Sequence, residues 1–287
     1  MDAFLDPQHF ESVAAQIEPW RGILFFGILI ILTTLEIAFP RRESLMKIGA
    51  RWRVNFFLGT LNVVLLRLLL PLGLIGVAGF YQGGVIPSLN INPLAGFCLS
   101  ILVLDLIIYV QHRLFHIIPL FWRFHQVHHS DLDLDTSSAV RFHPGEAFLS
   151  FIIKAIAVMV FGIGANAILI FEILLSSFAL FNHSNIGLGK FDRVLRLLIV
   201  TPNMHRLHHS RDHEEVKMNF GFCLSLWDRL LRTYQENPRI EMTHLPLGIE
   251  AYQTTQPNMI ETLTLPFKAT TTDKKNNVAG FKSSNKN

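Results

Sequence analysis

Long apolar runs separated by short polar segments dominate this chain. Five of them reach or nearly reach the length that a helix needs to cross a membrane. They cover residues 22–39, 56–79, 94–110, 147–162 and 165–181. Only a few residues separate the last two runs, which favours a hairpin of two short spans or a half-inserted pair. The pattern predicts an all-α fold, an integral membrane helical bundle.

The composition agrees with a membrane protein. Apolar residues make up 50% of the 287 residues and charged residues only 16%, which is more apolar than the core of a soluble domain requires. The first 20 residues carry acidic side chains and no basic segment, so we expect residues 22–39 to be an anchor and not a cleaved signal peptide. The formal charge is only +3 and no basic stripe lies outside the membrane-flanking positions, so nucleic acid binding is not expected.

The charges between the runs orient the bundle. Basic residues fill the first connection, whereas residues 81–93 carry no charge. Because cytoplasmic loops are enriched in Lys and Arg, the first connection should be cytoplasmic, and the second connection and the N-terminus external. The third run then returns the chain to the cytoplasmic side, and the hairpin leaves that side and comes back. The basic residues are Arg41, Arg42, Lys47, Arg51 and Arg53.

Eight of the 13 histidines stand in three tight groups, the histidine boxes. They are His112-x3-His116, His125-x2-His128-His129 and His205-x2-His208-His209. Spacings of three and four place side chains on one face of a helix, and imidazole is the commonest metal ligand. Histidines that cluster without function would seldom repeat the same spacing twice. The boxes therefore predict a metal centre in a histidine-rich helical cap on the cytoplasmic face of the membrane.

Local signals place two of the boxes on helices. Thr201 can cap a helix and Pro202 suits its first position, so the third box should begin a helix at this point. Residues 122–129 of the second box should likewise be helical and end near Ser130. The first box continues the third apolar run.

Two further histidines are candidates. His183 ends the fifth run at the point where the chain re-enters the cytoplasmic face, and this position recommends it as a ninth metal ligand. His143 precedes Pro144, which favours an extended or turn conformation, and we expect it to support the ligands without binding metal. The isolated His9, His213 and His244 are expected to be structural or surface residues.

Two acidic residues lie inside apolar runs, where an ionisable group is costly unless it has a partner. Asp105, Tyr109, His112 and His116 form one polar stripe on the third run. Asp105 either tunes the site or lines a substrate cavity, or it forms a structural hydrogen bond to another span, for example to Arg67. Glu172 in the fifth run is a second candidate for the cavity.

The number of imidazoles suggests two metal ions, because a single zinc site uses at most four protein ligands. Nitrogen-rich ligation suits iron, zinc or copper more than magnesium or calcium. A redox-inert pair would serve hydrolysis, whereas a redox pair would activate O₂ against a lipid C–H bond, and the histidines alone leave both open. Residues 162–167 match a dinucleotide-binding fingerprint, but they lie between two apolar runs with no preceding strand and are expected to form a turn.

Seven longer motifs surround the histidines. They are His112-Arg-Leu-Phe-His116, Trp122-Arg-Phe-His125-Gln-Val-His128-His129-Ser130, Arg141-Phe-His143-Pro144-Gly-Glu146, Asn182-His183-Ser-Asn185, Thr201-Pro-Asn-Met-His205-Arg-Leu-His208-His209-Ser210, Asn219-Phe-Gly221 and Leu226-Trp227-Asp228-Arg229-Leu230. Over about residues 95–235 these motifs resemble the fatty acid hydroxylase and sterol desaturase superfamily. The resemblance implies two iron ions in a non-haem centre held by the histidines, O₂ as oxidant, an external electron donor or reductase, and a lipid or sterol-like substrate that is hydroxylated or desaturated. Leu231-Arg-Thr-Tyr234 departs from the usual Phe-Gly-Thr-Tyr.

We therefore expect three regions. Residues 1–93 form a membrane anchor region, residues 94–236 a catalytic domain, and residues 237–287 a C-terminal extension that is disordered after about residue 265. The alternative function is that of a membrane electron-transfer or metal-handling protein with histidine-ligated haem or metal. Bound-haem absorbance would distinguish it from an oxygenase.

Overall fold

The computed structural model describes residues 20–80 and 83–268. Over these residues the fold is helical, with isolated bridges in place of strands, so the predicted all-α class is confirmed. His9 and the tail predicted to be disordered fall outside the described residues, apart from the start of that tail. There, residues Leu265–Phe267 form a short 3₁₀ helix, η5.

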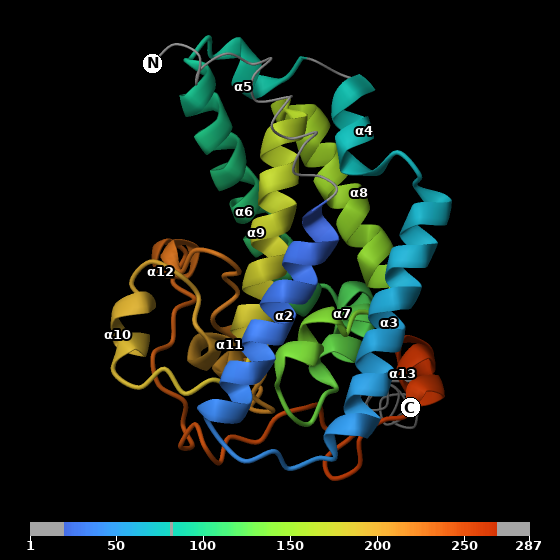
Figure 1. Ribbon diagram of the computed structural model, residues 1–287, viewed down its shortest axis with the longest axis vertical. Coiled ribbons are helices and arrows are strands. Elements are labelled where there is room, and N and C mark those ends of the chain that lie inside the picture. Colours follow the sequence, from blue (N-terminus) through green and yellow to red (C-terminus); the bar gives the residue numbers. More distant parts are fainter. Residues whose placement is uncertain (1–19, 81–82, 269–287) are drawn as a thin grey trace, which may run out of the picture.

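Five helices are long and apolar enough to cross a membrane, and they run roughly along the long axis of the molecule (Figure 1). This agrees with the predicted helical bundle. Their outward faces carry exposed large apolar side chains such as Ile30, Val63 and Leu68, as expected of surfaces that face lipid. The five are α2 (Arg21–Ala38), α3 (Ile48–Leu69), α6 (Pro93–Ile117), α8 (Pro144–Phe161) and α9 (Ala165–His183).

The second apolar run differs from the prediction. Its helix α3 begins at Ile48 and not at residue 56, so Arg51 and Arg53 lie inside the helix and not in the first connection. The helix ends at Leu69 because Pro71 removes a backbone donor and disfavours helical geometry in the residue before it. A second helix, α4 (Gly73–Phe80), starts at Gly73, whose positive φ of 57° suits glycine. A short helix, α5 (Val85–Ser88), follows.

The predicted hairpin between the fourth and fifth runs is confirmed. Helix α8 ends at Phe161 and is capped by Gly162, which adopts the left-handed conformation, and α9 begins at Ala165. A side chain at Gly162 would collide with the carbonyl oxygen of Gly83, so glycine serves close packing here as well as the turn. Residues 162–167 are therefore a turn and the first residues of a helix, as expected. An apolar core lies between α4, α6, α8 and α9.

Shorter elements gather at one end of the bundle and form the cap, residues 118–143 and 184–268 (Figure 1). Helix α7 holds the second histidine box and α11 the third, and Thr201 caps α11 through its side chain as predicted. The elements of the cap are α7 (Pro119–His129), η3 (Thr136–Val140), α10 (Phe191–Leu195), α11 (Pro202–His208), η4 (Glu215–Lys217), α12 (Leu226–Leu230), α13 (Met259–Thr264) and η5.

A buried ionic cluster joins the bundle to the cap. The Arg51 guanidinium on α3 donates to Asp131 at 2.7 Å and to Asp135 at 2.8 Å, just after the second histidine box. Burial would raise the pKa of Asp131, but the charges of Arg51 and Arg141 together with the hydrogen bonds from Arg51 and Ser138 outweigh it and hold that pKa below its ordinary value. Arg42 binds Asp133 at 2.9 Å in the same loop. These contacts explain how arginine is accommodated at the base of a spanning helix.

We predict that Asp131→Asn destabilises the protein by about 3–5 kcal/mol, because it leaves Arg51 buried without its closest counter-charge. The matched control is Asp212→Asn, which removes the largely exposed Asp212–Arg239 pair and should cost at most about 1 kcal/mol. Thermal unfolding of both variants in detergent measures the difference. Equal losses of stability in the two variants would contradict the role of the ionic cluster.

Candidate metal centre

The structure brings the nine predicted ligand histidines together in two groups, in each of which one ring nitrogen per residue lies within 4.8 Å of the others. They come from α6, α7, α9 and α11, so all three boxes and His183 lie at the same end of the bundle. The five-histidine group contains His112, His116, His125, His129 and His208, and the four-histidine group contains His128, His183, His205 and His209.

Each His-x2-His-His box divides its histidines between the two groups. The first and last histidines of a box, four residues apart, lie about 40° from each other around the helix, whereas the middle histidine lies about 60° to the other side of the first. On α7 the pair joins the five-histidine group and His128 joins the other. On α11 the pair joins the four-histidine group and His208 joins the first. Because both boxes have this spacing, α7 and α11 each contribute histidines to both groups.

The four-histidine group has the spacing of metal ligands. The His183 Nε2 lies 3.0 Å from that of His128 and 2.9 Å from that of His205, and the Nε2 atoms of His205 and His209 are 3.1 Å apart. A metal with bonds of 2.0–2.1 Å holds neighbouring ligand nitrogens about 3.0–3.4 Å apart. The four nitrogens therefore fit one metal ion.

The five-histidine group contains buried nitrogens without a partner. Among the described residues, the Nε2 atoms of His116, His125, His129 and His208 are buried and accept or donate no hydrogen bond. Buried polar atoms are nearly always hydrogen-bonded, so several unpaired nitrogens that converge on one point indicate a binding site for a metal ion. Nitrogen donors without carboxylates suit iron, zinc or copper. The residues present therefore fit a second metal ion.

Hydrogen bonds at the opposite ring nitrogen orient many of these imidazoles. A histidine that donates through Nδ1 keeps the lone pair of Nε2 free for a metal. The acceptors come from the chain around the site, and one is a carboxylate. The bonds are His112 to the Phe220 carbonyl at 2.9 Å, His125 to Glu146 at 2.7 Å, His128 to the Arg141 carbonyl at 3.2 Å, His183 to the Ala179 carbonyl at 2.7 Å, and His208 to the Met218 carbonyl at 2.8 Å.

Burial keeps five of the grouped histidines neutral. Burial and then repulsion between neighbouring imidazoles lower the pKa of these side chains well below the ordinary value. This holds for His128, His129, His205 and His209, and the pKa of His208 falls to about 3. A neutral imidazole with a free lone pair is the form that binds metal.

Sequence analysis assigned no role to Glu146, which accepts the hydrogen bond of His125 and is itself buried. It lies in the first turn of α8, three residues after His143. The available signal was an acidic residue at the start of an apolar run, at the end of the Arg141–Glu146 motif. The carbonyls of Met218 and Phe220 were also missed, because any residue type can supply a backbone acceptor.

Asp105 lies on α6, seven residues before His112, and fixes the loop that orients two histidines of the five-histidine group. Its carboxylate accepts from the Trp227 indole at 2.8 Å and from the amides of Cys223 and Leu224 at 3.2 Å each. The suggested hydrogen bond between Asp105 and Arg67 was wrong, because Arg67 is exposed on α3. The loop from Met218 to Asp228 supplies both carbonyls that orient His112 and His208. Asp228 fixes the same loop through the amides of Phe220 and Gly221 at 2.8 Å each.

His143 lies outside both groups. It has the predicted extended conformation and caps α8, with its Nδ1 accepting from the Gly145 amide at 3.0 Å. Its Nε2 lies 3.3 Å from the Leu263 carbonyl. Both ring nitrogens are therefore engaged away from the histidine groups. His213 and His244 are exposed, as expected.

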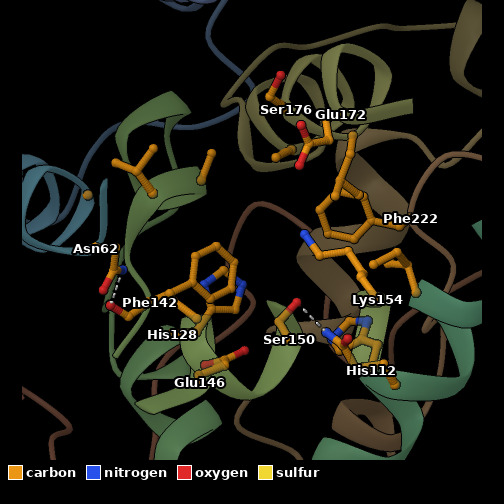
Figure 2. Close-up of a pocket in the computed structure, with 18 of the residues that line it drawn as sticks. Asn62, His112, His128, Phe142, Glu146, Ser150, Lys154, Glu172, Ser176 and Phe222 are labelled. Carbon is orange, nitrogen blue, oxygen red and sulfur yellow. Dashed lines mark hydrogen bonds between the residues drawn. The ribbon is translucent and has the colours of Figure 1, made fainter. Parts of the chain in front are cut away.

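An apolar cavity of about 360 Å³ extends from the histidines into the bundle. His112 and His128 border one part of it, and Lys154 and Glu172 line another (Figure 2). Glu172, the other predicted acidic candidate, forms an ion pair with Arg21 at 2.7 Å. The wall between these ends is formed mainly by apolar side chains. They include Phe25, Ile108, Phe115, Phe142, Leu175 and Phe222.

Comparison with known proteins agrees with this site. Residues 97–233 match the model of the fatty acid hydroxylase family. The chain is 30% identical over 149 residues to an ornithine lipid hydroxylase from Rhizobium tropici, a match that covers 51% of this chain and 44% of the relative. It is 29% identical over 133 residues to the alkylglycerol monooxygenase of Homo sapiens, covering 46% and 29%.

A third relative, the alkylglycerol monooxygenase of Danio rerio, is 31% identical over 153 residues, which cover 52% of this chain and 33% of the relative. The chain thus spans less than half the length of each of these relatives. No solved structure matches it. The matched segment contains all nine histidines of the two groups, so the similarity to the fatty acid hydroxylase family covers the whole candidate metal centre.

Proposed function

We propose that this protein is a membrane-bound non-haem di-iron oxygenase that uses O₂ to modify a lipid. The observation that carries the proposal is the arrangement of nine imidazoles, eight of them on buried residues, in two groups beside an apolar cavity within a bundle of membrane-spanning length. The family and the names of the relatives support a lipid substrate. Those names, a hydroxylase and a monooxygenase, favour oxygen insertion over desaturation.

The five-histidine and four-histidine groups would each hold one iron ion. Two bound irons would supply the redox chemistry that activates O₂ and attacks an unactivated C–H bond. The protein fixes the nitrogen ligands beforehand, because Glu146 and the surrounding carbonyls hold the ring orientations. His143, Asp105 and Glu172 do not bind metal in this proposal.

The cavity would position the lipid and keep water away from it. Its apolar wall would hold an acyl or sterol-like segment next to the histidines and keep water out, which limits side reactions. Phe115 and Phe142 lie where the cavity meets the histidine groups. Electrons would come from an external donor, because two cysteines are too few to hold an iron–sulfur cluster.

Haem ligation, the alternative, fits the site less well. A bis-histidine haem needs two imidazoles on opposite faces of a flat macrocycle. Here, four or five imidazoles converge on each point, and the ring nitrogens of His183, His128 and His205 are about as close together as ligands of one ion. No space for a macrocycle lies between them.

We also propose that the cap is cytoplasmic and that residues 94–236 form the catalytic domain. The basic residues at the base of α2 and α3 lie beside the cap, and Arg42 contacts the cap directly. The segment between α4 and α6, at the opposite end of the bundle, carries no charge. The excess of Lys and Arg on cytoplasmic segments therefore favours this orientation.

We predict about two iron ions per chain after purification in detergent from iron-replete cells, because two sets of nitrogen ligands fill two sites. Metal analysis together with an absorption spectrum tests this, and no Soret band should appear. A ratio near one metal per chain, or stably bound haem, would show that the di-iron proposal is wrong.

We predict that His183→Ala lowers iron content and abolishes lipid oxidation, because this side chain contacts two other members of the four-histidine group. His143→Ala should keep its iron and lose at most 10 to 100-fold in activity, which is typical of residues that support ligands. His244→Ala, at an exposed position, is the matched control. Full iron occupancy and ordinary activity in His183→Ala would remove this residue from the ligand set.

We predict the orientation of the chain from labelling of single cysteines in intact cells, in a Cys98→Ser background. An impermeant maleimide should react with Ser88→Cys from outside, and with Glu43→Cys and Glu214→Cys only after permeabilisation. Glu43 lies in the first connection and Glu214 lies in the cap. If Glu214→Cys reacted from outside and Glu43→Cys did not, the cap would not share a side with the first connection.

A further inference from the structure

The cavity contains three ionisable side chains away from the histidines. Arg21 comes from α2, Lys154 from α8 and Glu172 from α9, and all three line its wall. We call them the charged end of the cavity. Ionisable residues within spanning helices are costly, and they commonly mark the path or the binding site of a substrate. Nothing in the metal centre uses these residues.

Lys154 differs from its two charged neighbours. Arg21 and Glu172 form an ion pair at 2.7 Å, whereas no hydrogen bond or ion pair of Lys154 occurs within the described residues, and only the nearby charge of Glu172 attracts it. Figure 2 shows its amine pointing into the cavity beside Phe222. Two positive groups and one carboxylate leave the charged end with a net charge of +1. Because Lys154 has no carboxylate of its own in this apolar cavity, an anionic group bound beside it would be stabilised.

A purely structural role does not explain this placement. A lysine that only extends to the membrane surface would turn toward the end of its helix, where water is available. Lys154 lies seven residues before Phe161, the last residue of α8, and turns into the cavity instead. A lysine that only neutralised Glu172 would form an ion pair with it, but Arg21 already occupies that carboxylate.

We propose that the charged end binds an acidic group of the lipid, a carboxylate or phosphate whose oxygen accepts from the Lys154 amine. The inference rests on the proposed function, in that the lipid occupies this cavity. Glu172 holds Arg21 in place and reduces the cost of the empty site. The anion of the ligand completes the charge balance, so the site selects acidic over neutral lipids of the same chain length.

The two ends of the cavity are separated by a fixed length of helix. Lys154 lies eight residues after Glu146, which binds His125, so about 12 Å of α8 separates them at 1.5 Å per residue. Glu172 lies eleven residues before His183, about 16 Å along α9. The apolar chain of the ligand would cover this distance. The carbon that faces the histidines is therefore remote from the acidic group.

The test compares three probes with one chain length: dodecanol, dodecanoate and dodecyl phosphate. Each displaces a photoreactive diazirine analogue of dodecanol from the metal-free, full-length protein in detergent, and intact mass measures the labelling. We expect at least one acid to compete at a concentration about tenfold lower than the alcohol, because a hydrogen bond between two charged groups is stronger than one to a neutral hydroxyl. Whichever acid competes better identifies the group as carboxylate or phosphate.

Variants assign the preference to the charged end. Lys154→Met should abolish the preference for acids, Lys154→Arg should keep it, and Lys217→Met, at an exposed position of the cap, is the matched control. Glu172→Gln raises the net charge of the charged end from +1 to +2 and should strengthen the preference. This second variant decides the matter if Lys154→Met does not fold.

Equal competition by alcohol and acids in the natural protein would overturn the proposal. An unchanged preference in Lys154→Met, or a preference in Glu172→Gln that does not rise, would do the same. Because binding is measured without iron or O₂, a negative result leaves the proposed oxygenase untouched. Conversely, a protein that bound acids selectively but held no iron would contradict the oxygenase and keep this inference.

Discussion

The convergence of nine imidazoles is the constraint on which the rest of the structure depends. Among the described residues, four Nε2 atoms of the five-histidine group have no hydrogen-bond partner, and those of the four-histidine group face one another. This arrangement is unfavourable unless metal ions resolve it. The surrounding segments hold the rings despite that cost. Glu146, the backbone carbonyls of the cap and the loop fixed by Asp105 and Asp228 each restrain a ring or the segment that restrains it.

The bundle and the cap depend on each other through buried polar contacts. A helix in lipid satisfies its own backbone, but the cap is a set of short helices and loops that have little stability alone. Arg51 and Arg42 fix the loop of Asp131 and Asp133, which directly follows the second histidine box. The same contacts allow α3 to begin with arginines and still pack against the protein.

Much of this could be predicted from the sequence, because it depends on local periodicity. The spans, the hairpin at Gly162, the cap of α11 by Thr201 and the common location of the boxes follow from apolar length, turn chemistry and spacing. The division of the histidines between two groups did not follow, since it depends on how α7 and α11 face each other. The partner of Asp105 and the role of Glu146 were missed for the same reason: each contact joins segments whose packing the sequence pattern does not specify.

Helices α8 and α9 connect the metal centre with the far part of the cavity. Each carries a residue that fixes the histidines, Glu146 or His183, and a charged residue farther along, Lys154 or Glu172. A helix is stiff over such lengths, so the separation between the two functions is set by the number of residues between them. A residue inserted between the two positions on either helix would shift the charged residue relative to the residue at the histidines. Substrate length, polarity and the carbon presented to the histidines are therefore coupled through the geometry of one helical hairpin.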